Sequence, residues 1–262
     1  MTTHHGIARI VTTALSGTDT VHLVLEAPWL LQARPGQFVM LRVGDGTAPL
    51  LRRPFSLCAV THSGIELLVK IRGNGTERMA RWPAGHAVDI IGPLGNGFQP
   101  PPAGTASAVL VAGGIGLAPL VCLARWLRDN RPECAVRMLL GARTGTDCDA
   151  LIPFIPPSCA LQIATDDGSR GTRGLVTDLL EDAAVLRPAP VFYGCGPMPM
   201  LQALANCARR AGLPCFVSLE AHMACGVGAC LGCTVPAITP RGPAQVRVCA
   251  DGPVFDSRLI FP

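Results

Sequence analysis

The uncharged run SAVLVAGGIGLAPLVCLA at residues 107–124 decides how the middle of this chain folds. Its length reaches the threshold for a helix that spans a membrane. However, Gly113, Gly114, Gly116 and Pro119 interrupt the run, its first half is a β-type run, and its second half is typical of a helix. We therefore predict a buried parallel strand, a tight turn and a buried helix, and we do not expect a membrane span.

The same alternation of strand and helix continues on the C-terminal side of this run. Further helical patterns cover residues 175–183 and 199–211. Strand-like runs occur at residues 108–111, 136–140, 161–164, 191–193 and 216–217. An order of strand, helix, strand, helix predicts a Rossmann-like parallel α/β domain with helices on both faces of the sheet, over residues 102–217.

The N-terminal part, residues 1–101, has a different pattern. It ends at the proline-rich linker 99–104, because proline cannot donate to a strand ladder. Short β-type runs separated by turn residues occur at 7–13, 20–25, 38–43, 55–60, 65–71 and 87–91. This spacing predicts a small antiparallel barrel or sandwich, with one short helix at residues 76–81.

The tail, residues 218–262, shows little regular pattern but carries the most specific motif. Cys225, Cys230, Cys233 and Cys249 have the spacing of plant-type [2Fe–2S] ligands, which supply two thiolates to each iron. The glycines among them allow backbone N–H groups to approach the sulfur atoms. A structural zinc site is the alternative, although zinc favours two short paired spacings and only Cys230 and Cys233 form such a pair.

Composition and charge exclude several classes of function. Of the 262 residues, 49% are hydrophobic and 15% are charged, which argues against disorder. The formal net charge is +4, Lys70 is the only lysine, and the arginines are scattered. We therefore expect neither a nucleic-acid partner nor a polybasic membrane patch.

The N-terminus and the other cysteines indicate the compartment. The first ten residues, MTTHHGIARI, lack the charged and apolar regions of a secretory signal. Outside the tail, eight cysteines are dispersed without a framework spacing, which does not suggest disulfides. We expect a cytoplasmic protein, in which thiols stay reduced.

Two motifs lie where ligands bind in open α/β sheets, beyond the carboxyl ends of strands. Gly113, Gly114 and Gly116 allow a phosphate to approach the backbone at the start of a helix, although a tight turn without a ligand is the alternative. Cys195 and Gly196 follow a later strand, so Cys195 is a candidate to face a nicotinamide ring. The alternative for Cys195 is a small buried hydrophobic residue.

The N-terminal part contains a candidate flavin site. Arg53 suits a pyrophosphate through paired hydrogen bonds, and Phe55 offers a surface to a flavin ring. Ser56 and Thr76 offer hydroxyl groups, and the backbone near Gly75 offers N–H groups. Each residue also has an ordinary interpretation, as a surface arginine, a core phenylalanine or a turn glycine.

Taken together, these motifs resemble a known family. RPFS, GNGT, GGIGLAP and YGCGPMPM are similar to motifs of the ferredoxin–NADP reductase superfamily, which joins an FAD-binding barrel to a nicotinamide-binding α/β domain. The tail, SLEAHMACGVGACLGC and VCADGPVF, resembles the electron-transfer subunits of NAD-dependent dihydroorotate dehydrogenase. DDGS at 166–169 and GPLGNGF at 92–98 support this resemblance, which extends over nearly the whole chain.

The resemblance implies a role for each matching position. The residues that it assigns to FAD are Arg53, Pro54, Phe55, Ser56, Lys70, Ile71, Arg72, Gly75 and Thr76. It assigns the cluster to the four tail cysteines, and NAD to Gly113, Gly114, Gly116, Cys195 and Gly196. One departure is Phe55, since the wider superfamily often has a tyrosine there; phenylalanine keeps the stacking surface and loses a hydroxyl.

The resemblance also implies partners. They are an FMN-containing catalytic subunit that oxidises dihydroorotate, in a heterotetramer of two subunits of each kind, and NAD⁺ as electron acceptor. Nothing in the sequence convincingly supplies a base and a pocket for a pyrimidine, which favours a subunit over a complete enzyme. The preference for NAD over NADP rests mainly on the resemblance, because Arg143 is placed to meet a 2′-phosphate while Asp147 lies nearby.

Three hypotheses remain open from the sequence. The chain is the electron-transfer subunit of dihydroorotate dehydrogenase, or a related reductase subunit that serves ferredoxin, a hydrogenase or another oxidoreductase, or a binding protein with a structural zinc module. A flavin links the first two chemically, since it accepts a hydride and passes on single electrons.

Overall fold

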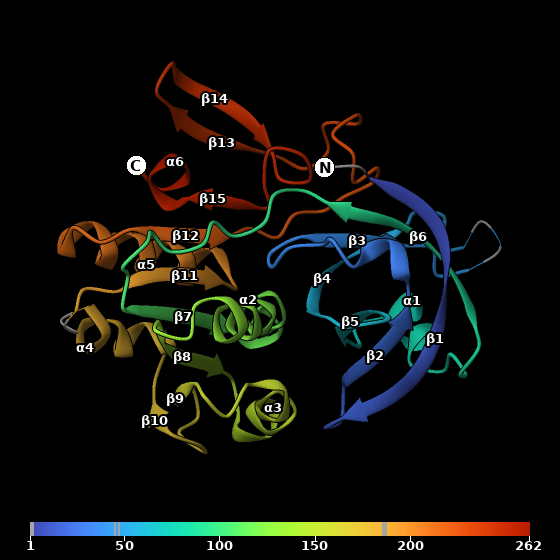
Figure 1. Cartoon of the computed structure of the whole chain (residues 1–262), viewed down its shortest axis with the longest axis horizontal. Coiled ribbons are helices and arrows are strands. Elements are labelled where there is room, and N and C mark those ends of the chain that lie inside the picture. Colours follow the sequence, from blue (N-terminus) through green and yellow to red (C-terminus); the bar gives the residue numbers. More distant parts are fainter. Residues whose placement is uncertain (1–2, 45, 47, 185–187) are drawn as a thin grey trace.

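The computed structural model describes residues 3–44, 46, 48–184 and 188–262. Its N-terminal part is a closed antiparallel barrel, drawn in blue to teal in Figure 1. The strands follow the order β1-β2-β5-β4-β3-β6 around the barrel. Their bounds are β1 His4–Ser16, β2 Thr20–Glu26, β3 Phe38–Leu41, β4 Arg53–Val60, β5 Gly64–Lys70 and β6 Ala87–Leu94.

Alternating apolar residues close the barrel around its own core. In β2, Val21, Leu23 and Leu25 are fully buried, and Leu67 of β5 meets them across the barrel strands. This period-two burial is what a strand with one face toward a core requires. The short 3-10 helix η1, Pro28–Leu30, and helix α1, Asn74–Met79, complete this part. Of the two predicted architectures, barrel and sandwich, the structure confirms the barrel.

The second part is a sheet in the order β10-β9-β8-β7-β11-β12-β15. All neighbours in it are parallel except β15, which runs antiparallel to β12. The bounds are β7 Ser107–Gly113, β8 Ala135–Ala142, β9 Ala160–Thr165, β10 Thr172–Arg173, β11 Val191–Cys195, β12 Cys215–Ser218 and β15 Val254–Asp256. The chain order reverses between β7 and β11, which makes this the switch point of the sheet.

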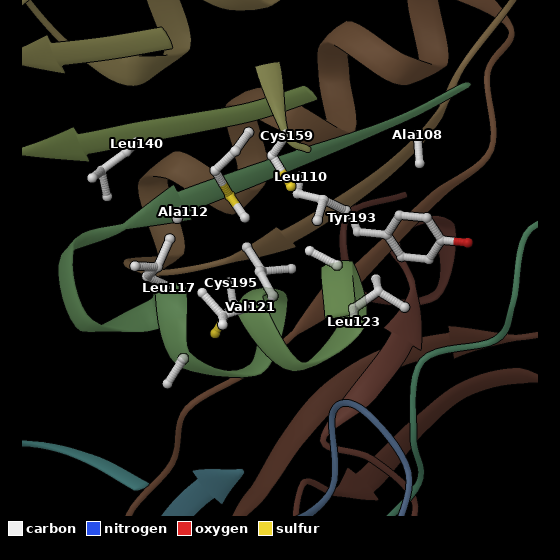
Figure 2. Close-up of a cluster of buried hydrophobic side chains, with 14 of the residues drawn as sticks. Ala108, Leu110, Ala112, Leu117, Val121, Leu123, Leu140, Cys159, Tyr193 and Cys195 are labelled. Carbon is white, nitrogen blue, oxygen red and sulfur yellow. The ribbon is translucent and has the colours of Figure 1, made fainter. Parts of the chain in front are cut away.

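Helices cover both faces of this sheet, as the sequence predicted. Alternate residues of β7 point to opposite sides: Leu110 packs with helix α2 and Val111 packs with helix α5. Figure 2 shows the side that faces α2, with Leu110, Leu117 and Tyr193 among the buried side chains. The helix bounds are α2 Leu117–Asn130, α3 Gly145–Asp149, α4 Leu180–Ala184 and α5 Met198–Ala211, with 3-10 helices η2 Gly114–Gly116, η3 Ile152–Phe154 and η4 Val176–Leu179.

The uncharged run at residues 107–124 forms β7, η2 and the first half of α2, which confirms the predicted strand, turn and helix. Within the described ranges, no helix is both long and apolar enough to cross a bilayer. The predicted helix at 175–183 is divided between η4 and α4.

The tail has more regular structure than its sequence indicates. It forms a hairpin of β13, Thr234–Thr239, and β14, Gly242–Arg247, and it ends with the short helix α6, Ser257–Ile260. Figure 1 shows this hairpin in red beside the sheet edge formed by β15. These elements escape sequence analysis because β15 depends on pairing with β12, and the hairpin strands do not alternate cleanly between apolar and polar residues.

Candidate electron-transfer site

The tail cysteines lie in the loop before β13 and in the turn after β14. Cys233 and Cys249 are buried, Cys225 is half-buried and Cys230 is exposed. Cys225 interacts with Cys230, and Cys249 interacts with both Cys233 and Cys225. A [2Fe–2S] cluster needs four thiolates, two for each iron.

Backbone N–H groups point at these sulfur atoms. The N–H of Gly228 donates to Sγ of Cys249 at 3.1 Å, and the N–H of Cys249 donates to Sγ of Cys233 at 3.4 Å. Partial burial raises the pKa of Cys225, but the N–H groups of Cys230 and Val227 outweigh it and lower that pKa to about 6. Donors of this kind stabilise thiolate sulfur, so the loop suits a metal–thiolate group.

Glycines shape the loop and seat it on the barrel. A Cβ atom on Gly226 would lie 2.6 Å from Cγ of Met40 in β3, and Gly226 has a φ of +73°. The loop therefore packs closely on the barrel on one side. On the other side it presents the exposed Cys230 beside the exposed side chains of Val227 and Leu231.

The candidate flavin residues lie along one edge of the barrel. Arg53, Pro54, Phe55 and Ser56 begin β4 and are half-buried, while Gly75 and Thr76 belong to α1. The structure brings the two segments together, because a Cβ on Gly75 would lie 3.8 Å from Nε of Arg53. The hydroxyl of Thr76 accepts from the N–H of Arg72 at 2.9 Å, so it fixes the turn between β5 and α1.

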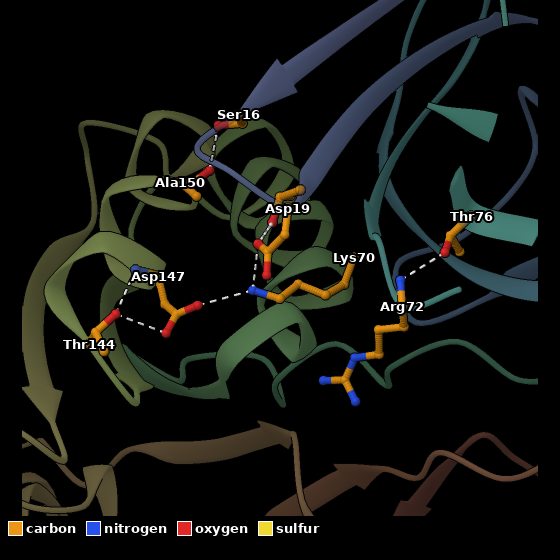
Figure 3. Close-up of polar contacts among 9 residues, drawn as sticks. Ser16, Asp19, Lys70, Arg72, Thr76, Thr144, Asp147 and Ala150 are labelled. Atoms are coloured by element: carbon orange, nitrogen blue, oxygen red, sulfur yellow. Dashed lines mark hydrogen bonds and ion pairs between the residues drawn. The ribbon is translucent and has the colours of Figure 1, made fainter. Parts of the chain in front are cut away.

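Lys70, which the resemblance assigns to FAD, forms two ion pairs in the structure. Figure 3 shows its ammonium held between two carboxylates, with Nζ 2.7 Å from Oδ1 of Asp19 and 3.0 Å from Oδ1 of Asp147. Burial lowers the pKa of Lys70, but these two hydrogen bonds outweigh it and raise the pKa above its usual value. Because Asp147 belongs to α3, Lys70 ties the barrel to the α/β domain. Ile71, which follows, packs against the barrel core.

The glycines of the two βα turns converge at the switch point. A Cβ on Gly116 would lie 2.4 Å from the carbonyl oxygen of Cys195, and a Cβ on Gly196 would lie 2.9 Å from Cα of Gly113. Only glycine allows backbones to approach this closely. Gly114 faces open space with a φ of +54°. The structure thus unites the two motifs in the crevice where dinucleotides bind in such sheets.

Cys195 lies at this crevice as a buried, neutral thiol. Burial raises its pKa to about 12, and the charge of Glu220 adds to the rise. A thiol with this pKa is no nucleophile at neutral pH. Its position at the end of β11 suits packing against a flat ring, and not covalent chemistry.

Glu220, which follows β12, was missed by sequence reasoning. It borders solvent, yet neighbouring protein atoms desolvate its carboxyl and raise the pKa, while Arg72 opposes that rise. Glu220 therefore interacts both with Arg72 from the flavin segment and with Cys195 from the nicotinamide segment. No local sequence signal marks it, because its neighbours come from distant parts of the chain.

Comparison with known proteins identifies the family. Residues 220–261 match the model of the iron–sulfur cluster binding domain of dihydroorotate dehydrogenase B. The chain is 39% identical over 255 residues to the dihydroorotate dehydrogenase B (NAD(+)) electron transfer subunit of Desulforamulus reducens, across 95% of both chains. It is 42% identical over 244 residues to the corresponding subunit of Bacillus caldolyticus, across 90% of both. The chain belongs to this family of electron transfer subunits.

A solved structure agrees with this membership. That of an NADH-dependent reduced ferredoxin–NADP oxidoreductase, described in a study of flavin-based electron bifurcation, matches with a TM-score of 0.83 and 28% identity. The match covers 97% of this chain and 90% of the other. Family membership confirms the predicted class of protein, an oxidoreductase subunit with a ferredoxin–NADP reductase-like fold, and excludes the structural zinc module.

Proposed function

We propose that this electron transfer subunit carries electrons from an FMN-containing catalytic subunit, which oxidises dihydroorotate to orotate, to NAD⁺. The path runs through a [2Fe–2S] cluster in the tail and an FAD on the barrel. The observation that carries the proposal is that the four tail thiols lie in one loop and the following turn, where backbone N–H groups donate to the sulfur atoms of Cys249 and Cys233. The family to which the chain belongs supports this proposal, because its members are named electron transfer subunits of an NAD(+)-dependent dihydroorotate dehydrogenase.

The proposed cluster ligands are Cys225 and Cys230 on one iron, with Cys233 and Cys249 on the other. The exposed Cys230 marks the side from which a partner protein can exchange electrons, and the buried Cys233 and Cys249 face the protein interior. Potentials of such clusters depend on hydrogen bonds to sulfur and on solvent exposure. The loop therefore controls both access and potential.

FAD supplies the conversion between one hydride and two single electrons. Arg53 is the proposed pyrophosphate ligand, because its guanidinium lies near Gly75 at the start of α1. Phe55 and Ser56 are the proposed contacts to the flavin ring, and Pro54, Ile71, Arg72 and Thr76 shape the segment around it. We propose that Lys70 acts indirectly, since Asp19 and Asp147 hold its ammonium.

NAD is proposed to bind at the switch point, with its phosphates over Gly113, Gly114 and Gly116. Its nicotinamide would lie against Cys195 and Gly196. The open space at Gly114 and the tight backbone contacts at Gly116 and Gly196 support this arrangement. The neutral Cys195 thiol would exclude water from the ring without reacting with it.

The remaining parts of the proposal concern organisation. We propose that residues 1–101 serve FAD, residues 102–217 serve NAD and residues 218–262 serve the cluster. The assembly proposed is a heterotetramer of two of these subunits and two catalytic subunits. The eight cysteines outside the tail are free thiols, and thiols stay reduced in the cytosol, so the proposed location is the cytoplasm.

Reconstitution with the catalytic subunit tests this function. The purified chain, loaded with FAD and iron, is mixed with an FMN-containing dihydroorotate dehydrogenase subunit, and NADH formation from dihydroorotate and NAD⁺ is followed by absorbance. We expect NADH only when both subunits are present, and none when the chain carries Cys233→Ser. No NADH from the mixture, together with rapid transfer from NADH to ferredoxin, would favour the related reductase function instead.

A further inference from the structure

An ion pair beside the cluster loop has no role in the function described so far. Arg247, at the end of β14, and Asp251 hold each other through several contacts. Nε of Arg247 donates to Oδ2 of Asp251 at 2.9 Å, and Nη2 donates to Oδ1 at 2.8 Å. The backbone N–H of Arg247 also donates to Oδ2 at 2.8 Å. Two parallel contacts between a guanidinium and a carboxylate fix geometry as well as charge.

The same two residues close the turn that carries Cys249. The carbonyl of Arg247 accepts from the N–H groups of Ala250, Asp251 and Gly252, at 3.1, 2.8 and 3.3 Å. Cys249 lies inside this turn, between the two partners of the ion pair. The position of its sulfur therefore depends on the closed turn.

Arg247 also reaches across to the loop that holds Cys225 and Cys230. Its Nη1 donates to the carbonyl of Gly228 at 3.2 Å, and the N–H of the same glycine donates to Sγ of Cys249 at 3.1 Å. A Cβ on Gly228 would lie 3.0 Å from Nη1 of Arg247 and 2.8 Å from Cβ of Ala250, so the contact needs glycine. The guanidinium thus holds the residue that donates to the cluster sulfur.

The charge of Arg247 acts on the cluster sulfur atoms. Its guanidinium interacts electrostatically with both Cys249 and Cys233. The pair is partly exposed, with 39% of the Arg247 side chain and 37% of the Asp251 side chain accessible, so water weakens its field without removing it. An adjacent positive charge favours the reduced, more negative form of a cluster, and a negative charge disfavours it.

We propose that the Arg247–Asp251 ion pair tunes the reduction potential of the cluster through the balance of its two opposite charges. It places a charge beside Cys249 that is balanced by its own partner, and it fixes the Gly228 N–H donor. This inference rests on the proposed iron–sulfur site. It goes beyond that site because it assigns a tuning role to two residues that bind neither iron nor flavin.

The two halves of the pair predict shifts of opposite sign. Arg247→Gln leaves the Asp251 carboxylate uncompensated beside Cys249, so the potential falls. Asp251→Asn leaves the guanidinium uncompensated, so the potential rises. The double variant has no net charge at the pair, as in the parent, so its potential lies close to that of the parent. Each single shift is about tenfold in the equilibrium constant for reduction, equivalent to about 59 mV for one electron.

The experiment is a redox titration of the full chain loaded with FAD and iron, followed by the electron paramagnetic resonance signal of the reduced cluster. Iron and flavin are assayed on every sample, so that a failure of the iron–sulfur proposal appears as a parent chain without iron. Arg258→Gln is the matched control, because Arg258 of α6 forms a similar pair with Asp256 at the end of β15 and its side chain is 78% exposed. Its potential should equal that of the parent.

Opposite shifts in the two single variants, with a return in the double variant, support the proposal. Equal potentials in all variants, or shifts in one direction, overturn it. If a single variant loses iron, Arg247→Lys separates a role of the charge from a purely structural role, because lysine keeps the positive charge. Retained iron with a potential near that of the parent supports the proposal, and lost iron shows a purely structural role and contradicts it.

Discussion

At the scale of single residues, the four tail cysteines that we propose as cluster ligands have unequal environments. Burial, with Cys233 adding to it, raises the pKa of Cys249 to about 12, whereas the pKa of Cys225 is lowered to about 6. Cys233 is buried beside Cys249 and receives an N–H donor from it. The inner pair is therefore the one most dependent on the protein, and the outer pair is the one nearest to solvent.

Replacing Cys233 with serine should remove most of the cluster absorbance. A serine oxygen is a poor substitute for a thiolate on iron. FAD should remain, since the barrel edge around Arg53 does not use Cys233. Iron and flavin assays check both expectations, with Cys134→Ser as the matched control on a buried cysteine outside the tail. An intact cluster in the Cys233 variant would show that the ligand assignment is wrong.

Replacing Arg53 with alanine should lower FAD occupancy. The guanidinium supplies charge-assisted hydrogen bonds, each worth about 1.5–3 kcal/mol, so we expect affinity for FAD to fall at least about tenfold. Flavin released on dilution measures this directly. Arg81→Ala, an exposed arginine just after α1, is the control. Unchanged affinity in the Arg53 variant would contradict its pyrophosphate role.

The spacing of the four tail cysteines along the chain is enough to predict them as cluster ligands, because it lies within one segment of sequence. The sequence did not predict the neighbours of Lys70, since Asp147 lies 77 residues away and only the folded structure brings them together. Glu220 escaped for the same reason, and so did the contact of Arg247 with Gly228, which lies 19 residues away. Local spacing reveals a ligand set, whereas the charges that tune a site come from tertiary packing.

At the scale of elements, the two βα turns after β7 and β11 form one crevice. The carbonyl of Cys195 occupies the place that a side chain on Gly116 would need. The sequence predicted both turns from their glycines and strands. It could not show that they meet, because the order of strands in a sheet is not written in any single segment.

Gly116→Ala should therefore disturb the nicotinamide site. The added methyl must displace the backbone after β11, and such overpacking costs about 1–3 kcal/mol of stability. We expect reduction of the flavin by NADH to slow about 10–100-fold, since small misplacements at a reacting centre have effects of this size. Stopped-flow absorbance measures the rate.

The control for this variant is Gly212→Ala, after α5. Gly212 has a φ of +66° and open space around it, so alanine there is strained but touches no ligand crevice. We expect a cost of about 1–2 kcal/mol in stability and an unchanged rate of flavin reduction. Equal rates of flavin reduction in the two variants would contradict the proposal that the nicotinamide binds at the switch point.

At the scale of the whole molecule, a set of polar contacts fixes the barrel against the α/β domain. Glu66 of β5 accepts from Arg125 of α2 at 3.2 Å, and His22 of β2 supports the same carboxylate from within the barrel at 3.1 Å. The hydroxyl of Ser16 donates to the carbonyl of Ala150 at 2.6 Å, as Figure 3 shows. These contacts hold the flavin edge and the nicotinamide crevice in one fixed relation.

Acid should weaken this interface. The hydrogen bond from His22 is the main cause that lowers the pKa of Glu66, with Arg125 adding to it against burial. Because the pKa is lowered in the folded state, the charged carboxylate of Glu66 stabilises the fold at pH values above about 4.3, the usual pKa of glutamate. This stabilisation is lost as the pH falls through the pKa of the folded state. The loss therefore occurs below about pH 4.3.

Glu66→Gln tests that contribution. At neutral pH we expect the free energy of unfolding to fall by about 1–3 kcal/mol, and the difference from the parent chain to shrink in acid. Denaturant unfolding at several pH values measures both. Glu133→Gln, on an exposed pair with Arg131, should have little effect. A difference that stays constant down to pH 3 would contradict the role of Glu66.

The central claim is that electrons pass between nicotinamide, FAD and a two-iron cluster within this one chain. The most direct test is the anaerobic visible spectrum of the pure chain before and after NADH is added, with iron, zinc and flavin assayed on the same sample. The account predicts about one FAD and about two irons per chain, with flavin and cluster bands that both bleach. A colourless sample that contains zinc, or bands that do not respond to NADH, would contradict it.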